Sequence, residues 1–424
     1  MFHFVSMHGE FKMSEMLTTH ILKKLNDPGL EINPEVFEKL LATDGAASDH
    51  FGHSVVASAD GLTVVVGAYL GDGIIRNSGS AYVFTKQANG NYFQAQKLLT
   101  SDGVVQDYFG CSVAISADGL VVVVGAFSGG DEGSGTGVTY VFTKQANGSY
   151  LQTQKLLASD GIFGDAFGNS VAISGDGSTI VVSANCDDDK GPDSGSAYIF
   201  TKQPNGSYLE TQKLLASDGA SGDFFGGSVA VSGDGSTLVV GAYGDDDKGP
   251  DSGSAYIFTK QTDGNYLQTQ KLSTSDGAVQ DYFGCSVAIS ADGTTVAVGA
   301  FTGGGEGTGT VYVFTKQADG SYLETQKLVA TDGAAYDSFG ISVAVSENGS
   351  TVVIGAYGDD DKGIDSGSAY IFTKQSDGSY LQTQKLVASD GAASEHFGTS
   401  VAVSNTSVVI GAPHHLSKGA AYVY

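Results

Sequence analysis

Three acid-rich segments carry the residues with the clearest capacity for chemistry. They read NCDDDKGPDSG from Asn185, YGDDDKGPDSG from Tyr243 and YGDDDKGIDSG from Tyr357. Alternating Asp residues around a Gly turn can offer several oxygens to Ca²⁺, which takes roughly six to eight, with carbonyls, waters or other acids supplying the rest. The candidate ligands are Asp187, Asp189, Asp193, Asp245, Asp247, Asp251, Asp359, Asp361 and Asp365.

The alternative interpretation of these segments is a solvated turn that was copied by duplication. Asp side chains then cap backbone amides of the turn, and Lys190, Lys248 or Lys362 offsets part of the charge. The spacing of the acids matches no established Ca²⁺ loop, which favours the solvated turn.

Histidines form a second candidate metal site. Neutral imidazoles near carboxylates are typical ligands of Zn²⁺ and similar metals. The sequence has no HxH or HxxxH spacing in this group, so surface histidines in the least regular repeats are the alternative. Five of the eight histidines lie in the first and last repeats described below: His50, His53, His396, His414 and His415.

The length and net charge of the chain limit the possible fold classes and partners. A single core stops growing near ~250–300 residues, so a chain of 424 residues predicts several domains or a repeat array. The net charge of −26 repels phosphate, which argues against nucleic acid and anionic membranes and leaves cations, basic proteins and neutral sugars. No apolar run approaches the ~20 residues of a membrane span, and the N-terminus lacks the pattern of a signal peptide, so the compartment stays open.

An internal repeat predicts the architecture. The dipeptide Phe-Gly recurs in steps of 58 residues, with one step of 56, and Ser-Val follows each copy after one residue. A Gly-Ala comes about fifteen residues later in six copies, whereas the third copy has Ser183-Ala184. Units of this length, repeated seven times, are typical of a β-propeller. The repeats start near Phe51, Phe109, Phe167, Phe225, Phe283, Phe339 and Phe397.

Each unit predicts four strands, A to D. In the fourth unit these are SVAVS (228–232), TLVVGAY (237–243), SAYIFTK (254–260) and YLQTQKL (266–272), with Asp-Gly or Asn-Gly turns typical of hairpins. The last unit lacks strand D, but EVFEKLLATDG (35–45) aligns with it and would close the ring. The prediction is an all-β, seven-bladed propeller of four-stranded blades over residues 35–424. It follows an N-terminal extension (1–34) with a short amphipathic helix from Ser14 to Leu25.

The repeats resemble a known family. FGGSVAVSGDGSTLVVGAY (225–243) and FGTSVAVSNTSVVIGAP (397–413) are similar to FG-GAP repeats, the blades of the integrin α-subunit propeller, and most similar to a short microbial and algal variant. The resemblance covers about residues 36–424 and implies a propeller with an adhesion or ligand-binding role. Integrin-type blades bind Ca²⁺ through a long Asp-rich A–B turn. The A–B turns of this chain are too short for that, so no Ca²⁺ sites are expected at Asp60, Asp118, Asp176, Asp234 and Asp292.

Strand directions place most acids on one face. The D–A and B–C loops emerge together, and they contain thirty of the 47 acids, sixteen of them in the B–C loops. Because the D–A acids recur in every blade, turn capping is the favoured interpretation for them. The D–A pairs are Asp44/Asp49, Asp102/Asp107, Asp160/Asp165, Asp218/Asp223, Asp276/Asp281, Asp332/Asp337 and Asp390/Glu395.

The sequence favours binding over catalysis. It contains no P-loop, GxSxG or HExxH motif, and its polar groups are copied around a ring, whereas an active site is asymmetric. We expect a monomeric, non-catalytic interaction module that binds a protein or cell-surface ligand through the acidic face, with Ca²⁺ as cofactor if the acid-rich loops bind it. The alternatives are a carbohydrate-binding propeller, which exposed aromatic residues between blades would favour, and a scaffold without a ligand.

Overall fold

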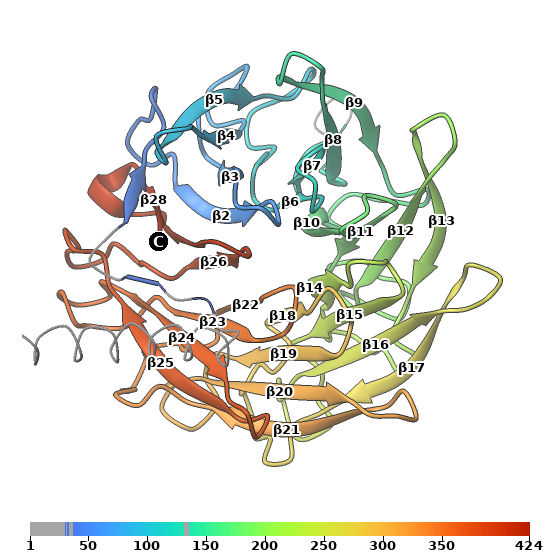
Figure 1. The fold of residues 1–424 in the computed structure, drawn as a ribbon. Helices are drawn as coiled ribbons and strands as arrows, with labels where there is room; N and C mark the ends of the chain where they lie inside the picture. Colours follow the sequence, from blue (N-terminus) through green and yellow to red (C-terminus); the bar gives the residue numbers. More distant parts are fainter. Residues whose placement is uncertain (1–29, 31, 34–36, 131–134) are drawn as a thin grey trace, which may run out of the picture.

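The protein is a ring of seven antiparallel sheets of four strands each. The structure is a computed structural model that describes residues 30, 32–33, 37–130 and 135–424. The sheets lie around a central axis (Figure 1). In six of them the four strands follow one another in the sequence, and in the seventh the order is β1-β28-β27-β26. The predicted all-β, seven-bladed propeller is therefore confirmed. The predicted helix from Ser14 to Leu25 lies outside the described residues.

The strands repeat in the same order in each blade. Strands A, nearest the axis, are β2 (Phe51–Ala57), β6 (Val113–Ile115), β10 (Phe167–Ile173), β14 (Phe225–Val231), β18 (Ser286–Ile289), β22 (Ser342–Val345) and β26 (Ser400–Val403). Strands B are β3 (Thr63–Ala68), β7 (Val121–Ala126), β11 (Thr179–Ala184), β15 (Thr237–Ala242), β19 (Thr295–Ala300), β23 (Thr351–Ala356) and β27 (Val408–Ala412).

The two outer positions complete the blades. Strands C are β4 (Ser80–Lys86), β8 (Val138–Lys144), β12 (Ser196–Lys202), β16 (Ser254–Lys260), β20 (Thr310–Lys316), β24 (Ser368–Lys374) and β28 (Ala420–Val423). Strands D are β5 (Tyr92–Leu98), β9 (Tyr150–Leu156), β13 (Tyr208–Leu214), β17 (Tyr266–Leu272), β21 (Tyr322–Leu328), β25 (Tyr380–Leu386) and β1 (Glu38–Leu40). A short 3₁₀ turn covers His415–Ser417.

Burial explains why these segments are strands. Every residue of β15 is buried, as expected for a mostly apolar strand between two neighbouring blades. Strand β17 alternates buried and exposed side chains, which suits an outer strand with one face in solvent. The apolar core is therefore a series of layers between adjacent blades, and loops at each end are free to carry other functions.

The repeated Phe-Gly and Gly-Ala dipeptides meet at the seams between blades. A Cβ built on Gly241 of blade 4 would lie 2.0 Å from the carbonyl oxygen of Gly284 in blade 5. The hydroxyl of Ser228 donates a hydrogen bond of 2.9 Å to the same oxygen. Phe283, beside Gly284, is fully buried against Tyr312, with ring centroids 5.6 Å apart. The close approach leaves no room for a side chain at Gly241, and Gly284 has a φ of +94°, a conformation that favours glycine.

The N-terminal strand closes the ring, as predicted. Strand β1 pairs antiparallel with the C-terminal strand β28, with Glu38 opposite Val423, so the two ends of the chain share one blade (Figure 1). Leu40 is buried in this blade, and the Ser400 hydroxyl donates to the carbonyl of Gly52 in the first blade at 2.8 Å. No helix in the described part of the chain is long and apolar enough to cross a membrane.

Removal of residues 1–41 tests the closure. This truncation uncovers the edge of β28 and removes the buried Leu40 side chain, whose burial alone is worth about 2–5 kcal/mol. We expect a lower melting temperature and aggregation in size-exclusion chromatography. The control is removal of residues 1–29, which leaves β1 in place and should preserve both the melting temperature and the elution volume. Equal stability of the two truncated proteins would contradict the closure.

Candidate functional site

The acid-rich loop of blade 4 surrounds a lysine. Lys271, on the outer strand β17, has its Nζ atom 2.8 Å from Asp218, 2.8 Å from Asp245 and 2.6 Å from Asp247. Asp245 is buried, whereas the other two carboxylates reach solvent. The Tyr256 hydroxyl lies within hydrogen-bond distance of both Asp218 and Asp245, at 3.0 and 2.9 Å. The ammonium group therefore occupies the position where the carboxylates converge.

The structure brings together two of the three predicted Ca²⁺ ligands of this loop. Asp245 and Asp247 lie together, and Asp245 also accepts hydrogen bonds from the Ser254 hydroxyl and the Asp247 amide, at 3.0 and 3.1 Å. Asp251 is not part of this group; its backbone amide donates to the carboxylate of Asp246 at 2.8 Å. The third carboxylate at the lysine is instead the first acid of the D–A loop.

Two other blades repeat the arrangement. In the described residues, the Nζ atoms of Lys213 and Lys385 each lie 2.7–2.8 Å from three carboxylates. As at Asp251, the backbone amides of Asp193 and Asp365 donate to the second Asp of their own DDDKG segment. The carboxylates are Asp160, Asp187 and Asp189 in blade 3, and Asp332, Asp359 and Asp361 in blade 6.

Electrostatics keep the lysine charged. Burial alone would lower the pKa of Lys271, but its hydrogen bonds to the three carboxylates outweigh burial and raise that pKa above its usual value. Burial opposes ionisation of Asp218, and the bonds to Lys271 and Tyr256 lower its pKa in spite of it. In the described residues, Asp218, Asp245 and Asp247 form the one group whose spacing would suit a metal ion. Lys271 is the cation that this group holds.

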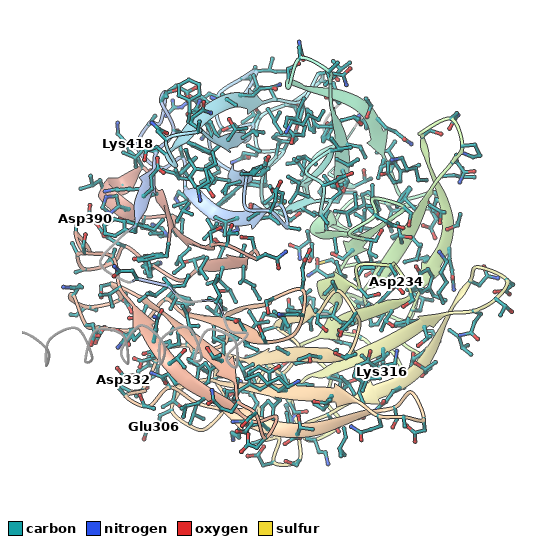
Figure 2. The ribbon with its side chains drawn as sticks, in the orientation of Figure 1. Asp234, Glu306, Lys316, Asp332, Asp390 and Lys418 are labelled. Atoms are coloured by element: carbon teal, nitrogen blue, oxygen red, sulfur yellow. The ribbon has the colours of Figure 1, made fainter. Side chains whose placement is uncertain are left out.

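A simpler form of this cluster occurs in every blade. A lysine of strand D pairs with the first acid of the D–A loop at 2.6–2.8 Å, and in six blades a tyrosine hydroxyl of strand C donates to that acid. Asp332 and Asp390, two of these acids, lie at the outer part of the ring (Figure 2). The pairs are Lys97–Asp44, Lys155–Asp102, Lys213–Asp160, Lys271–Asp218, Lys327–Asp276, Lys385–Asp332 and Lys39–Asp390.

The second acid of each D–A loop caps its own turn. Its carboxylate is buried and accepts a hydrogen bond of 2.6–3.1 Å from the backbone amide three residues earlier, as Asp223 does from Ala220. Burial raises the pKa of Asp223 to about 6. Turn capping is thus confirmed for the second acids, which are Asp49, Asp107, Asp165, Asp223, Asp281, Asp337 and Glu395.

The histidines form a half-buried group on the same face. The rings of His50 and His396 each contact His414 with centroids 4.6 Å apart, and His53 contacts Tyr69 at 4.4 Å. Within the described residues, no three of these imidazoles bring their nitrogens together as a metal site requires. The predicted proximity of blades 7 and 1 is confirmed, but the contacts are between ring faces and edges.

His415 is separate from that group. It is buried, and its Nδ1 lies 2.9 Å from the Glu395 carboxylate and 3.4 Å from the Tyr422 hydroxyl. Its Nε2 makes a short contact with Lys39 Nζ. His415 therefore takes the place beside the lysine that an Asp of the acid-rich loop takes in blade 4.

Aromatic side chains continue from the histidines around the axis. One arc runs through Tyr357, His396, His414, His50, Tyr69, Tyr108 and Phe127, and a second runs through Phe224, Tyr243, Tyr282 and Phe301. Neighbouring ring centroids lie 4.6–6.4 Å apart, and all these side chains are half-buried. All of them except His414 directly precede Phe-Gly or directly follow Gly-Ala. The sequence analysis singled out only the three histidines of the first arc, because the residue type at this position varies.

Comparison with known proteins agrees with this geometry. The family model described as FG-GAP repeat matches residues 35–84, 92–142, 150–200, 208–258, 266–314, 322–372 and 380–424. The chain belongs to the FG-GAP repeat family. A crystal structure of a protein from Lactobacillus plantarum has a similar fold, with a TM-score of 0.53 and 15% identity over 84% of this chain and 89% of that chain. No curated protein matches the sequence.

Lys271→Met tests the role of the lysine in this FG-GAP blade. The variant keeps the apolar stem but leaves the buried Asp245 carboxylate without a counter-charge, so we expect a loss of about 3–5 kcal/mol in the free energy of unfolding. Millimolar Ca²⁺ should restore part of it, because three carboxylates then converge without a cation. The matched control is Lys260→Met, which removes a contact with the Tyr266 ring and an electrostatic interaction with Asp176 but pairs with no buried carboxylate among the described residues. Chemical denaturation with and without Ca²⁺ measures the loss in unfolding free energy and its recovery. Equal unfolding free energies of Lys271→Met and Lys260→Met would refute the role of Lys271 as the counter-charge of the three carboxylates.

His53 predicts a pH dependence of stability. Burial, with smaller contributions from His50 and His414, lowers the pKa of His53 to about 4. The unfolded chain, with a histidine pKa near ~6.5, then binds more protons than the folded chain as the pH falls from about 6.5 to 4. The contribution of His53 should therefore lower the free energy of unfolding by up to about 3 kcal/mol between pH 6.5 and pH 4.

The His53→Gln variant isolates this contribution. Asp223 acts in the opposite direction, because its raised pKa stabilises the folded state as the pH falls through about 6. The quantity to measure is therefore the difference between the unfolding free energies of the two proteins at pH 7.5, 6, 5 and 4. The unaltered protein should lose stability relative to the variant below pH 6.5. A difference that does not change with pH would show that His53 is freely protonated in the folded state.

Proposed function

We propose that this FG-GAP propeller is a non-catalytic binding module that engages a protein or cell-surface ligand on the face of the D–A and B–C loops. The observation that carries the proposal is the pair of half-buried aromatic arcs around the axis on that face. Aromatic side chains supply much of the energy of protein interfaces, particularly near the centre of the contact. The repeated acids of the D–A and B–C loops pair with lysines of the same protein or cap their own turns, which supports a binding role rather than catalysis.

The charge around the arcs favours a basic partner. The chain has a net charge of −26, and although the lysines of strand D pair with many loop acids, others such as Asp188 and Asp246 are exposed. A negative surface accelerates association with a basic protein and repels nucleic acid and anionic membrane. The proposed ligand is therefore a protein segment rich in Lys and Arg.

Calcium is not required by this proposal. Ca²⁺ could bind Asp245 and Asp247 only by displacing Lys271, and the same holds for Lys213 and Lys385 in their blades. The residues present therefore fit an internal ammonium better than a resident Ca²⁺ ion. Melting of the unaltered protein in EDTA and in millimolar Ca²⁺, at fixed ionic strength, should give the same temperature.

Carbohydrate binding is the second candidate, and the aromatic arcs are the observation that favours it. The Phe of Phe-Gly and the Tyr of strand C are core residues, but Tyr69, Tyr108, Tyr243 and Tyr282 lie half-buried at blade seams. Tyrosine rings in such positions can stack on sugars. A glycan array carried out beside the peptide experiment below separates the two candidates.

Selection from a phage-displayed peptide library tests the proposal. We expect enriched peptides rich in Lys and Arg, whose affinity falls about 30-fold or more in the double variant Tyr243→Ala/Tyr282→Ala because aromatic anchors are lost. The control is Leu120→Ala, which alters an exposed side chain on the A–B turns of the other face. Melting curves check that each variant is folded. Enrichment of glycans alone would establish the second candidate, and peptides insensitive to the double variant would contradict the first.

A further inference from the structure

The B–C loop of blade 5 is shorter and less bulky than the loops of the acid-rich blades. Its ends keep the backbone pattern of blade 4, because the Gly303 amide donates to the Ala300 carbonyl and the Gly309 amide to the Gly303 carbonyl, both at 2.9 Å. Between these ends the chain reads GGGEGTG, where blade 4 has DDDKGPDSG. The loop is therefore two residues shorter, and three glycines replace three adjacent Asp side chains.

A cavity lies beside this loop. It has a volume of about 480 Å³, which is within the range of small-molecule sites. Its lining consists of Thr302 and residues 304–307 of the B–C loop, Asp276 and residues 278–282 of the preceding D–A loop, and Lys327 of strand β21. The Thr302 hydroxyl donates to the carbonyl of Gln280, so the two loops that line the cavity are joined to each other.

The lining carries more negative than positive charge. It contains the carboxylates of Asp276, Asp281 and Glu306 against the single ammonium of Lys327. Lys327 Nζ lies 2.7 Å from Asp276, and these two charges offset each other. Among the described residues, the carboxylates of Asp281 and Glu306 then have no salt-bridge partner. The cavity therefore favours a cation and repels an anion.

Asp281 is the buried member of this pair of carboxylates. It is 7% exposed, and its Oδ2 accepts a hydrogen bond of 2.7 Å from the Ala278 amide. Among the described residues no group donates to its Oδ1, which is open to water, whereas Oδ1 of Asp107 at the same position in blade 2 is sealed. Burial raises the pKa of Asp281, and the Ala278 amide and Lys327 offset only part of that rise. A cation at Oδ1 would stabilise the ionised carboxylate.

Glu306 supplies the second carboxylate from the other loop. Its carbonyl accepts a hydrogen bond of 2.9 Å from the Tyr336 amide, which holds the backbone at this position. In the acid-rich blades the corresponding acceptors are the carbonyls of Pro192, Pro250 and Ile364, so an uncharged residue stands there. Glu306 is exposed and lies toward the outer part of the ring (Figure 2). The acid at this position is thus a feature that distinguishes blade 5 from those blades.

The cavity adjoins the second aromatic arc. Tyr282 lines the cavity and belongs to the arc, where its ring stacks on Phe301 with centroids 5.2 Å apart. Val279, which is 56% exposed, also lines the cavity and offers an apolar surface to the methylene groups of a long side chain. A protein segment that lies on the arc can therefore extend one side chain into the cavity.

An organic cation suits these carboxylates better than a metal ion. In the described residues, the one group with the spacing of metal ligands is Asp218, Asp245 and Asp247 in blade 4, so the carboxylates of the cavity are too far apart to share an ion. A guanidinium group presents five N–H donors in a planar fork and can reach carboxylates on two separate loops. It also stays charged at any pH at which the protein is folded.

We propose that the blade 5 cavity binds the guanidinium group of an arginine side chain from the basic protein ligand. The guanidinium donates to Asp281 Oδ1 and to the Glu306 carboxylate, and the methylene groups of the arginine lie against Val279. This inference rests on the proposed function, and it assigns to the ligand one arginine anchor beside the aromatic arc.

Titration calorimetry with two probes tests the chemistry of the cavity. The probes are N-acetylargininamide and N-acetylcitrullinamide, which have nearly the same shape but differ in charge, at pH 7 and constant low ionic strength. We expect saturable binding of the arginine probe and at least tenfold weaker binding of the citrulline probe, because its urea group has no charge to pair with the carboxylates. Equal binding of the two probes, or no saturable binding of the arginine probe, would overturn the proposal.

Variants place the binding in blade 5. Asp281→Asn/Glu306→Gln preserves the shape of both side chains and should weaken binding of the arginine probe at least tenfold. The control Asp337→Asn/Asp319→Asn removes two charges from other loops and should leave the affinity unchanged. Val279→Arg supplies a tethered guanidinium at the cavity and should prevent binding of the probe. Retained binding in Val279→Arg would overturn the proposal even if the first double variant failed to fold.

The peptides selected for the proposed function separate the two conclusions. Peptides that need Tyr243 and Tyr282 but bind equally well to Asp281→Asn/Glu306→Gln would leave the binding function in place and overturn the arginine anchor. Binding of the arginine probe that depends on these two acids, without enrichment of any peptide, would support the cavity and contradict the proposed function.

Discussion

The close approach of two glycine backbones at each blade seam is the constraint on which the rest of the structure depends. At six seams, a Cβ on the Gly of Gly-Ala would lie 1.9–2.1 Å from the carbonyl oxygen of the Phe-Gly glycine in the next blade. No side chain fits there, so substitution would separate the blades. The remaining seam has Ser183, and its hydrogen bonds differ: Ser170 accepts from the Val229 amide and donates its own amide to Ser183. The fold thus tolerates one exception when a hydrogen-bonded alternative replaces the contact.

The fixed seams place the D–A and B–C loops side by side, and this proximity creates the lysine clusters. A carboxylate such as Asp245 is buried and would be unfavourable alone, but the outer strand brings an ammonium to it. The lysine is tethered, so its local concentration does not depend on the medium, unlike that of a metal ion. A chain with 47 acids and 21 basic residues can in this way neutralise its most crowded acids without a cofactor.

Much of the fold could be predicted because the repeat is visible along the chain. The Phe-Gly period and the missing last strand were sufficient to predict seven blades and their closure by residues near Leu40. The partners of the acids could not be predicted in the same way. Lys271 lies 26 residues after Asp245, on the outer strand β17, and Asp218 lies 27 residues before Asp245. The sequence left two interpretations of the DDDKG segments, a cation site and a solvated turn, whereas the observed cluster pairs their acids with a lysine of strand D and with the first acid of the D–A loop.

A repeated architecture also affects where ligand sites should be sought. A polar group that recurs in every blade, such as the second D–A acid, is explained by the fold, because each copy makes the same internal hydrogen bond. The informative positions are those where one copy loses a group and its neighbours keep the partners. The same reasoning applies to the aromatic arcs, whose residue types change from blade to blade while their backbone positions are constant. Recognition of one ligand requires an asymmetric site. In this ring, asymmetry comes from positions where the side chain differs between blades while the backbone stays the same, and not from the repeated motif.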